Sequence, residues 1–173
     1  MHELILGGAR SGKSVHGETL AVQSACEVTY IATAQVYDDS EMRARIESHR
    51  ERRPSHWALV EAPLSLGEAI ERHARADRLL LIDCLTLWLT NLLLEGGQRF
   101  VQERARLLEA LDHAPGRVVM VSNEVGQGVV PMNALSRRFV DEAGQLHQVL
   151  ASRCQRVWWV VAGLPQCLKG NVT

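Results

Sequence analysis

The stretch Gly7-Gly8-Ala9-Arg10-Ser11-Gly12-Lys13-Ser14 decides the fold of this 173-residue chain. It has the pattern G-x-x-x-x-G-K-S of a P-loop, whose glycines let successive backbone N–H groups turn inward and form an anion-binding nest. In such a loop, Lys13 supplies a compact charge for the β- and γ-phosphates, and the hydroxyl of Ser14 is a ligand for Mg²⁺. The alternative is a glycine-rich turn with a solvated lysine.

The flanking sequence favours the P-loop. Residues 3–6 form a short apolar strand before the loop, and residues 15–23 form a plausible helix after it. A helix that begins near Gly12 would add its positive end to the phosphate site. The only other lysine is Lys169, whereas 17 of the 19 basic residues are arginines, so a lysine in this loop suggests a role that arginine cannot fill. The motif therefore predicts that the chain binds a nucleoside triphosphate.

Composition narrows the class of protein. The chain has 46% hydrophobic residues, a net charge of −1 and a pI near 6.7, which suit one compact domain over residues 1–173 and argue against a nucleic-acid partner. The apolar runs, residues 79–82 and 92–94 among them, are far too short for a membrane span, and we expect no signal peptide, because the N-terminus is strand and P-loop. Four scattered cysteines with no C-x-x-C pair predict reduced thiols in a cytoplasmic protein.

Strand-like and helix-like segments alternate along the chain. We expect strands over residues 3–6, 28–32, 57–60, 78–83, 118–122 and 157–161, and helices over residues 15–23, 40–52, 66–74, 85–94, 98–113 and 133–152. Nearly continuous apolar strands between helices predict a mostly parallel, doubly wound α/β sheet with helices on both faces, in the RecA-like P-loop NTPase class. The strand over residues 157–161 is expected to close the sheet.

Polar groups follow three of these strands, where ligands collect in such sheets. They are Ala32-Thr33-Ala34, Asp83 and Asn123-Glu124-Val125-Gly126, and we expect all three to lie near the P-loop. Asp83 ends an apolar strand in the Walker B manner, so its carboxylate can hold Mg²⁺ or its waters, although it could instead cap the following helix. The Asn-Glu-Val-Gly loop either positions a substrate or merely turns the chain.

Helical spacing places Arg45, Arg52 and Arg53 around His49. An imidazole among guanidinium groups stays neutral, and a neutral imidazole is a nucleophile beside a polyphosphate that arginines hold. The alternative is a solvated, charged helix face that carries one histidine. We expect the histidines at positions 16, 73, 113 and 147 to be structural and without partners, and Trp158-Trp159 to form core or subunit contacts.

The chain resembles the bifunctional adenosylcobinamide kinase/adenosylcobinamide-phosphate guanylyltransferase family of cobalamin biosynthesis. The resemblance runs nearly end to end and is carried by Gly7–Ser14, Tyr30–Ala34, Arg45-Ile46 with His49, Arg53-Pro54, Trp57 with Glu61, Thr90-Asn91-Leu92, Ser122–Gly126, and Val160 with Gly163-Leu164-Pro165. The P-loop alone would place the chain only among NTPases. The segment from His49 to Glu61, together with the Asn-Glu-Val-Gly loop, is specific to the family.

This resemblance implies two reactions. The first phosphorylates the aminopropanol hydroxyl of adenosylcobinamide with ATP or GTP, and the second transfers GMP from GTP to that phosphate through a guanylylated histidine, releasing pyrophosphate. The implied catalytic residues are His49 and Lys13, and the implied metal ligands are Ser14 and Asp83. Nucleotide contacts fall on Gly7, Gly8, Ala9, Arg10, Ser11, Gly12, Lys13, Ser14, Ala32, Thr33, Ala34, Arg50, Glu51, Arg52, Arg53, Glu61 and Asp83.

The family is trimeric, with sites near subunit interfaces, so the resemblance also implies a homotrimer. This chain departs from some relatives in having Ser48 before His49, where they carry two adjacent histidines, and no pattern assigns a role to its tail over residues 166–173. Two alternatives remain open: a P-loop small-molecule kinase without the transferase activity, and a RecA-like DNA-binding module. A regulatory GTPase is disfavoured because the chain has no Asn-Lys-x-Asp tetrapeptide.

Overall fold

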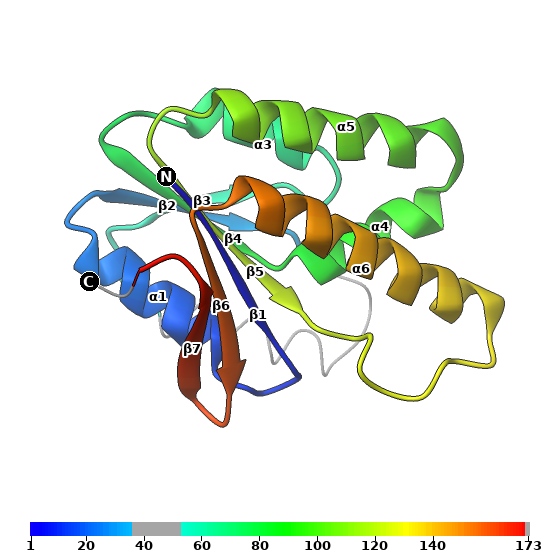
Figure 1. Ribbon diagram of the computed structural model, residues 1–173. Coiled ribbons are helices and arrows are strands. Elements are labelled where there is room, and N and C mark those ends of the chain that lie inside the picture. Colours follow the sequence, from blue (N-terminus) through cyan, green and yellow to red (C-terminus); the bar gives the residue numbers. More distant parts are fainter. Residues whose placement is uncertain (36–52, 172–173) are drawn as a thin grey trace.

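Seven strands form one sheet within residues 1–35 and 53–171, the residues that this computed structural model describes (Figure 1). The strands are β1 His2–Gly7, β2 Glu27–Ala32, β3 Ala58–Glu61, β4 Arg78–Asp83, β5 Arg117–Asn123, β6 Arg156–Val161 and β7 Leu164–Lys169. Their order across the sheet is β3-β2-β4-β5-β1-β6-β7, and every pair is parallel except β6 with β7. The expected mostly parallel sheet is confirmed.

The described helices cover both faces of this sheet. They are α1 Lys13–Gln23, α3 Leu66–His73, α4 Leu85–Glu95, α5 Gly97–His113 and α6 Ala134–Arg153. Helix α1 lies on one face, and α3 to α6 lie on the other (Figure 1). The helix expected over residues 40–52 falls outside the described residues.

Strand alternation explains how both faces can be buried. In β4, Leu80 and Ile82 point into the cluster beneath α3 to α6, whereas Leu79 and Leu81 point into the cluster beneath α1. A strand covered on both sides needs apolar residues at every position, which is why these strands read as continuous apolar runs. The doubly wound, RecA-like α/β fold follows from that pattern.

The sheet ends with a strand that the sequence did not predict, β7. Residues 157–161 do not close the sheet, because β7 pairs antiparallel with β6 beyond them. The two strands are joined by Ala162 and Gly163, both with positive φ (51° and 78°), as a tight hairpin turn requires. Strand β7 contains Pro165 and is mostly exposed, so it lacks the apolar run that marks the other strands. Proline is tolerated there because β7 is an edge strand.

A buried ion pair ties the P-loop strand to its neighbours. Glu3 is fully buried in β1, where the guanidinium of Arg117 donates to Oε1 with Nε at 2.9 Å and also with its terminal nitrogen. The indole Nε1 of Trp158 donates to Oε2 at 2.9 Å. A carboxylate can be buried when its lone pairs are satisfied in this way. The contacts connect β1 to β5 and β6.

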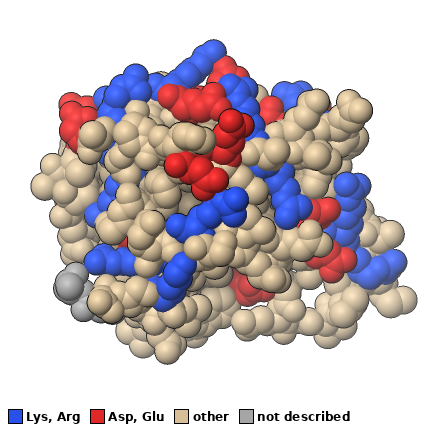
Figure 2. All heavy atoms as spheres, turned by 45° about the horizontal axis from the view of Figure 1, so that its top comes forward, with Lys and Arg blue, Asp and Glu red and all other residues tan. Residues whose placement is uncertain are grey.

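The described surface charges, cysteines and helices bear on the expectations drawn from composition. On the face formed by α3 and α5, acidic and basic side chains are intermixed (Figure 2), and Arg106 pairs with Glu68 at 3.3 Å and Glu71 at 2.7 Å. The four cysteines, all of them described, are free thiols, and Cys84 and Cys154 are buried. Among the residues with described positions, no helix has the length and apolarity needed to cross a membrane.

Candidate functional site

The P-loop runs from the end of β1 into the first turn of α1. Gly12 is the N-cap of α1 with φ 96°, and Arg10 also has positive φ at 57°. The backbone N–H of Ser11 donates to the carbonyl oxygen of Gly8 at 3.2 Å, which closes the turn. Residues with positive φ inside a loop can turn neighbouring backbone N–H groups to one side, as an anion-binding nest requires. The loop leads directly into the N-terminus of α1. The strand–loop–helix arrangement predicted from the motif is confirmed.

Two glycines of the loop have no room for a side chain. A Cβ on Gly7 would lie 2.4 Å from Ser11 Oγ and 2.6 Å from the carbonyl oxygen of Val160, and a Cβ on Gly12 would lie 3.0 Å from the Cα of Gly163. The turn between β6 and β7 supports the loop from outside, because the N–H of Gly163 donates to the carbonyl oxygen of Ser11 at 2.8 Å. The hairpin that the sequence did not reveal therefore holds the P-loop.

Lys13 is buried at the start of α1, with 8% of its surface exposed. Its Nζ donates to the carbonyl oxygen of Gly8 at 3.1 Å. Burial lowers the pKa of Lys13, and the nearby Asp83 carboxylate opposes that shift. The other lysine, Lys169, is exposed and caps α6 through the carbonyl oxygens of Ala151 and Ser152. Because Lys13 is buried in the loop, the alternative of a solvated lysine is excluded.

Asp83 ends β4 on the side of the sheet where Lys13 lies. The hydroxyl of Tyr30 donates to Asp83 Oδ2 at 3.2 Å. Burial, followed by the neighbouring Asp83 carboxylate, raises the pKa of Tyr30, so the phenol remains a hydrogen-bond donor. The N-cap residue of α4 is Cys84, and within the described residues it makes no side-chain capping bond. Tyr30 therefore orients Asp83, and Cys84, not Asp83, occupies the N-cap position of α4.

Thr33 joins the ends of β2 and β4. Its buried Oγ1 donates to the carbonyl oxygen of Cys84 at 2.7 Å and accepts from the N–H of Cys84 at 2.9 Å. The backbone N–H of Thr33 donates to the carbonyl oxygen of Asp83 at 3.3 Å. The amide of Asn91 in α4 donates to the carbonyl oxygens of Thr33 and Pro63, both at 2.9 Å. These bonds fix the position of Asp83 relative to its neighbours.

The end of β5 joins the same group of residues. Asn123 pairs in register with Gly7, and its Nδ2 donates to Thr86 Oγ1 at 3.0 Å. The N–H of Glu124 donates to the carbonyl oxygen of Gly7 at 3.0 Å. The three polar strand ends expected near the P-loop are therefore together at this edge of the sheet.

Of the remaining candidate residues, Arg53 and Glu61 lie within the described part of the chain, and the others lie outside it. The guanidinium carbon of Arg53 lies 4.9 Å from the centre of the Tyr30 ring, in a cation–π contact. Glu61 is exposed at the end of β3, where it faces Ala32 in register, and Ala32 faces Asp83 on its other side. His49, Arg50, Glu51 and Arg52 lie outside the described residues, as does Arg45.

The expectation that the four helical histidines have no partners is wrong for three of them. His147 Nε2 lies 2.7 Å from Ser122 Oγ, and its Nδ1 lies 3.8 Å from Glu124 Oε2. The ring of His16 packs edge-on against Trp158 with centroids 4.9 Å apart, and His113 Nδ1 lies 2.9 Å from the carbonyl oxygen of Glu109. Since 25 residues separate Ser122 from His147, no local pattern could have indicated their contact.

Ser14 and Asp83 supply the oxygen groups that suit a Mg²⁺ ion. One hydroxyl and one carboxylate form a small donor set, and Mg²⁺ in nucleotide sites uses one or two protein oxygens together with phosphates and waters. Both residues belong to elements that meet at the carboxyl edge, α1 and β4. The residues therefore fit the ion together with a bound triphosphate, and they do not form a complete cage without one.

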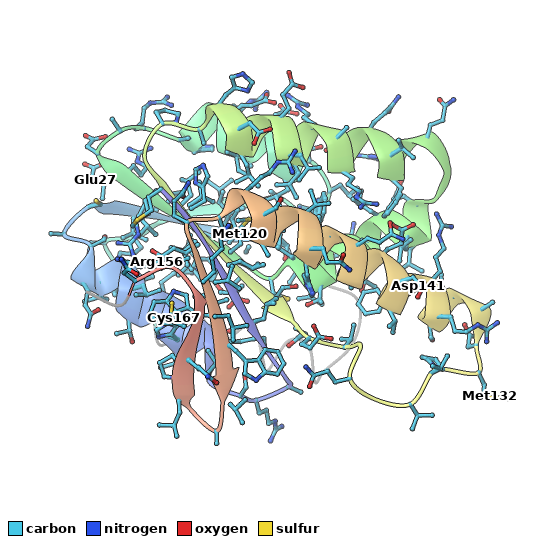
Figure 3. All side chains as sticks on the ribbon, in the orientation of Figure 1. Glu27, Met120, Met132, Asp141, Arg156 and Cys167 are labelled. Atoms are coloured by element: carbon cyan, nitrogen blue, oxygen red, sulfur yellow. The ribbon has the colours of Figure 1, made fainter. Side chains whose placement is uncertain are left out.

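An apolar groove lies beyond the site, between α4 and the start of α6. It has a volume of about 320 Å³, and its walls include Leu93, Leu94, Pro131, Leu135 and Phe139. The loop that leads into α6 exposes Val129, Val130 and Met132, and Figure 3 shows Met132 at its outer end. Exposed apolar side chains therefore gather at this end of the molecule.

Known proteins resemble the chain over nearly its full length. The sequence profile of the family described as "Cobinamide kinase / cobinamide phosphate guanyltransferase" matches residues 3–168. A protein of Pseudomonas aeruginosa named bifunctional adenosylcobalamin biosynthesis protein CobP is 59% identical over 172 residues, which are 99% of each chain. The protein CobU of Escherichia coli, with the same bifunctional description, is 43% identical over 93% of this chain and 96% of its own.

Solved structures share the fold at much lower identity. The RadB recombinase superposes with a TM-score of 0.53 at 15% identity over 91% of this chain and 73% of its own. An ATPase from a type III secretion system of pathogenic bacteria superposes with a TM-score of 0.54 at 12% identity over 96% of this chain and 56% of its own. These similarities support the RecA-like NTPase fold alone.

Proposed function

The chain belongs to the cobinamide kinase / cobinamide phosphate guanyltransferase family, and from that premise we propose that one nucleotide site at the carboxyl edge of its sheet serves two reactions. The protein is a bifunctional enzyme of cobalamin biosynthesis, a kinase and a guanylyltransferase. The observation that carries the site assignment is the P-loop with buried Lys13 beside Asp83. The proposed nucleotide site does not require a basic surface of the kind that binds nucleic acid.

In the first reaction, ATP or GTP binds with its phosphates in the nest of residues 7–14. The aminopropanol hydroxyl of adenosylcobinamide attacks the γ-phosphorus, an oxygen–phosphorus bond forms, and the bond to the β-phosphate oxygen breaks. Lys13 balances charge on the β- and γ-phosphates. Mg²⁺, when held by Ser14 and Asp83, would neutralise further phosphate charge. The products are adenosylcobinamide phosphate and a nucleoside diphosphate.

In the second reaction, His49 attacks the α-phosphorus of GTP. Pyrophosphate leaves, and the histidine carries GMP through a phosphorus–nitrogen bond. A phosphate oxygen of adenosylcobinamide phosphate then displaces the histidine and gives adenosyl-GDP-cobinamide. Arg50, Glu51, Arg52, Arg53 and Glu61 are the proposed GTP contacts of this step. Arg53, four residues after His49 in the sequence, supports the proposal, because it packs on Tyr30, which in turn holds Asp83.

We also propose a cytoplasmic homotrimer in which residues 1–173 form one catalytic domain. The exposed apolar loop at Val129, Val130 and Met132 is a surface that a second subunit would cover. Light scattering on purified protein should give three times the chain mass of 19.2 kDa. A monomeric mass would contradict the trimer.

The transferase half can be tested by incubating the protein with GTP labelled at the α-phosphate. A phosphorus–nitrogen bond is acid-labile and survives alkali, so label on the protein should be stable in base and lost in mild acid. His49→Ala should take no label and should still phosphorylate adenosylcobinamide, whereas the control His56→Ala should be labelled normally. If the His49→Ala protein takes label, the nucleophile is a different residue. If the wild-type protein takes no label, only the kinase activity remains supported.

A further inference from the structure

Glu124, in the Asn-Glu-Val-Gly loop, has no role in the reactions described above. It follows β5, the strand that lies directly beside the P-loop strand β1. Its backbone N–H donates to the carbonyl oxygen of Gly7 at 3.0 Å, and Asn123 before it pairs in register with Gly7. The loop is thus attached to the first residue of the phosphate nest.

The carboxylate of Glu124 is held in a defined orientation. Oε1 accepts from the N–H of Gly126 at 2.5 Å, and Oε2 lies 3.8 Å from His147 Nδ1. The side chain keeps 20% of its surface exposed. One oxygen is therefore fixed by the backbone, the other faces His147, and the side chain as a whole stays partly open to solvent.

His147 is itself fixed from behind. Its Nε2 lies 2.7 Å from Ser122 Oγ, and burial lowers the pKa of His147, which favours the neutral ring. When Ser122 donates to Nε2, the ring proton is on Nδ1 and faces Glu124. The order Ser–His–Glu is that of a hydrolytic triad, but Ser122 is completely buried in β5 and no substrate can reach it. Ser122 and His147 can therefore influence a substrate only through the carboxylate of Glu124.

We propose that Glu124 is the general base of the phosphorylation step and that His147 positions its carboxylate; the proposal rests on the kinase activity proposed above. As the substrate hydroxyl oxygen bonds to the γ-phosphorus, the hydroxyl proton passes to a carboxylate oxygen of Glu124. The bond between the γ-phosphorus and the β-phosphate oxygen breaks, and the nucleoside diphosphate leaves. Glu124 returns the proton to water after the products depart.

The other described carboxylates at this edge fit that role less well. Asp83 already accepts a hydrogen bond from Tyr30 and lies near Lys13, which suits a metal-binding role. Glu61 ends β3, and β2, β4 and β5 all lie between β3 and the P-loop strand. Glu124 alone among the three is attached directly to the P-loop backbone.

The test is Glu124→Gln, because glutamine retains an oxygen that can accept from Gly126. The loop should keep its shape, while the variant can no longer take a proton. We expect kcat for adenosylcobinamide phosphorylation to fall about 10²- to 10⁴-fold, with KM for nucleotide and adenosylcobinamide nearly unchanged. GMP transfer to preformed adenosylcobinamide phosphate should be retained. The exposed Glu109 provides a matched control, and Glu109→Gln should behave as wild type in both assays.

A second variant separates positioning from folding. His147→Gln should lower kcat by roughly tenfold, and the double variant Glu124→Gln/His147→Gln should lose no more than Glu124→Gln does, because His147 acts through the carboxylate. A purely structural role would instead give additive losses together with a lower melting temperature.

The proposal is overturned by additive losses, by a kcat for Glu124→Gln within about threefold of wild type, or by a loss confined to KM for adenosylcobinamide. A wild-type protein that phosphorylates no adenosylcobinamide would overturn both this inference and the proposed kinase activity, and the variants are not needed to see it.

Discussion

The P-loop and the polar network at the strand ends occupy the same edge of the sheet but are encoded in different ways. The P-loop is eight consecutive residues, and its backbone is the proposed phosphate site. The network, formed by Thr33, Cys84, Thr86, Asn91 and Asn123, joins side chains to side chains and to backbone groups up to 58 residues away. A site built from local backbone has a local signature, whereas a site built from buried side chains exists only once the strands are in order.

The largest effect should come from the local region, at Lys13. Lys13→Ala removes a buried cation from the β- and γ-phosphates and should lower phosphorylation about 10³-fold, as loss of one transition-state charge partner does. Lys13→Arg keeps the charge but misplaces it, so its loss should be similar. Steady-state kinase assays and melting curves measure both quantities. Near-normal turnover in either variant would refute the P-loop assignment.

Asp83 connects the two regions, since it lies near Lys13 and its strand end is fixed by Thr33. Asp83→Asn should raise the Mg²⁺ concentration needed for half-maximal activity roughly 10- to 100-fold. Asparagine still accepts from Tyr30, so folding should be little affected. Mg²⁺ titrations of the two proteins decide the question, and superimposable curves would mean that Asp83 does not hold the metal.

Adjacent glycines in the P-loop provide an internal comparison of stability. Gly7→Ala places a Cβ against Ser11 and the Val160 carbonyl, whereas a Cβ on Gly8 meets nothing within 4 Å. Gly7→Ala should cost up to about 3 kcal/mol of unfolding free energy, and Gly8→Ala should cost less than about 0.5 kcal/mol. Urea denaturation measures both. Equal losses would contradict the close contact of Gly7 with Ser11 and with the Val160 carbonyl of β6.

The strand-end network should respond to loss of a single hydroxyl. Thr33→Val leaves the buried N–H of Cys84 without its acceptor and should cost about 1–2 kcal/mol of unfolding free energy. Thr33→Ser should restore most of it, and Thr19→Val, which removes an exposed hydroxyl, should stay within about 0.5 kcal/mol of wild type. If Thr33→Val and Thr19→Val are equally stable, the network does not hold the strand ends together.

The smallest effect concerns His147 and pH. Because its pKa is lowered in the folded protein, the unfolded chain binds more protons, and the unfolding free energy falls as pH drops below the ordinary value of 6.5. His147→Gln should reduce that slope by less than about 1.4 kcal/mol per pH unit. It should not abolish the slope, because the pKa values of His2, His16 and His73 are also lowered. Unfolding curves between pH 5 and 7 give the slopes, and identical slopes would contradict a neutral, buried His147.

Features with a local sequence pattern could be predicted from the sequence, and features without one could not. Strand β4 was predicted with its observed bounds, since a strand buried on both faces is apolar at every position. Strand β7 was missed because an exposed edge strand with Pro165 has no such run. The P-loop residues and Asp83 were predicted as site residues from motifs that depend on neighbouring positions.

The contacts of Ser122, His147 and Glu124 could not be identified in that way. Glu124 was noticed only as part of a loop, and His147 was assigned no partner, because the contact depends on α6 packing over β5. Thr33 was expected at the nucleotide, but its hydrogen bonds to Cys84 depend on the pairing of β2 with β4. Sheet order, which brings these strands together, is a property of the whole chain.

The central claim is that one nucleotide site supports two separable reactions. The most direct test supplies wild type, Lys13→Ala and His49→Ala with adenosylcobinamide and GTP and identifies the corrinoid products by mass. Wild type should form adenosyl-GDP-cobinamide, His49→Ala should stop at adenosylcobinamide phosphate, and Lys13→Ala should form neither. Adenosyl-GDP-cobinamide from His49→Ala, or a wild-type reaction that ends at adenosylcobinamide phosphate, would contradict the account.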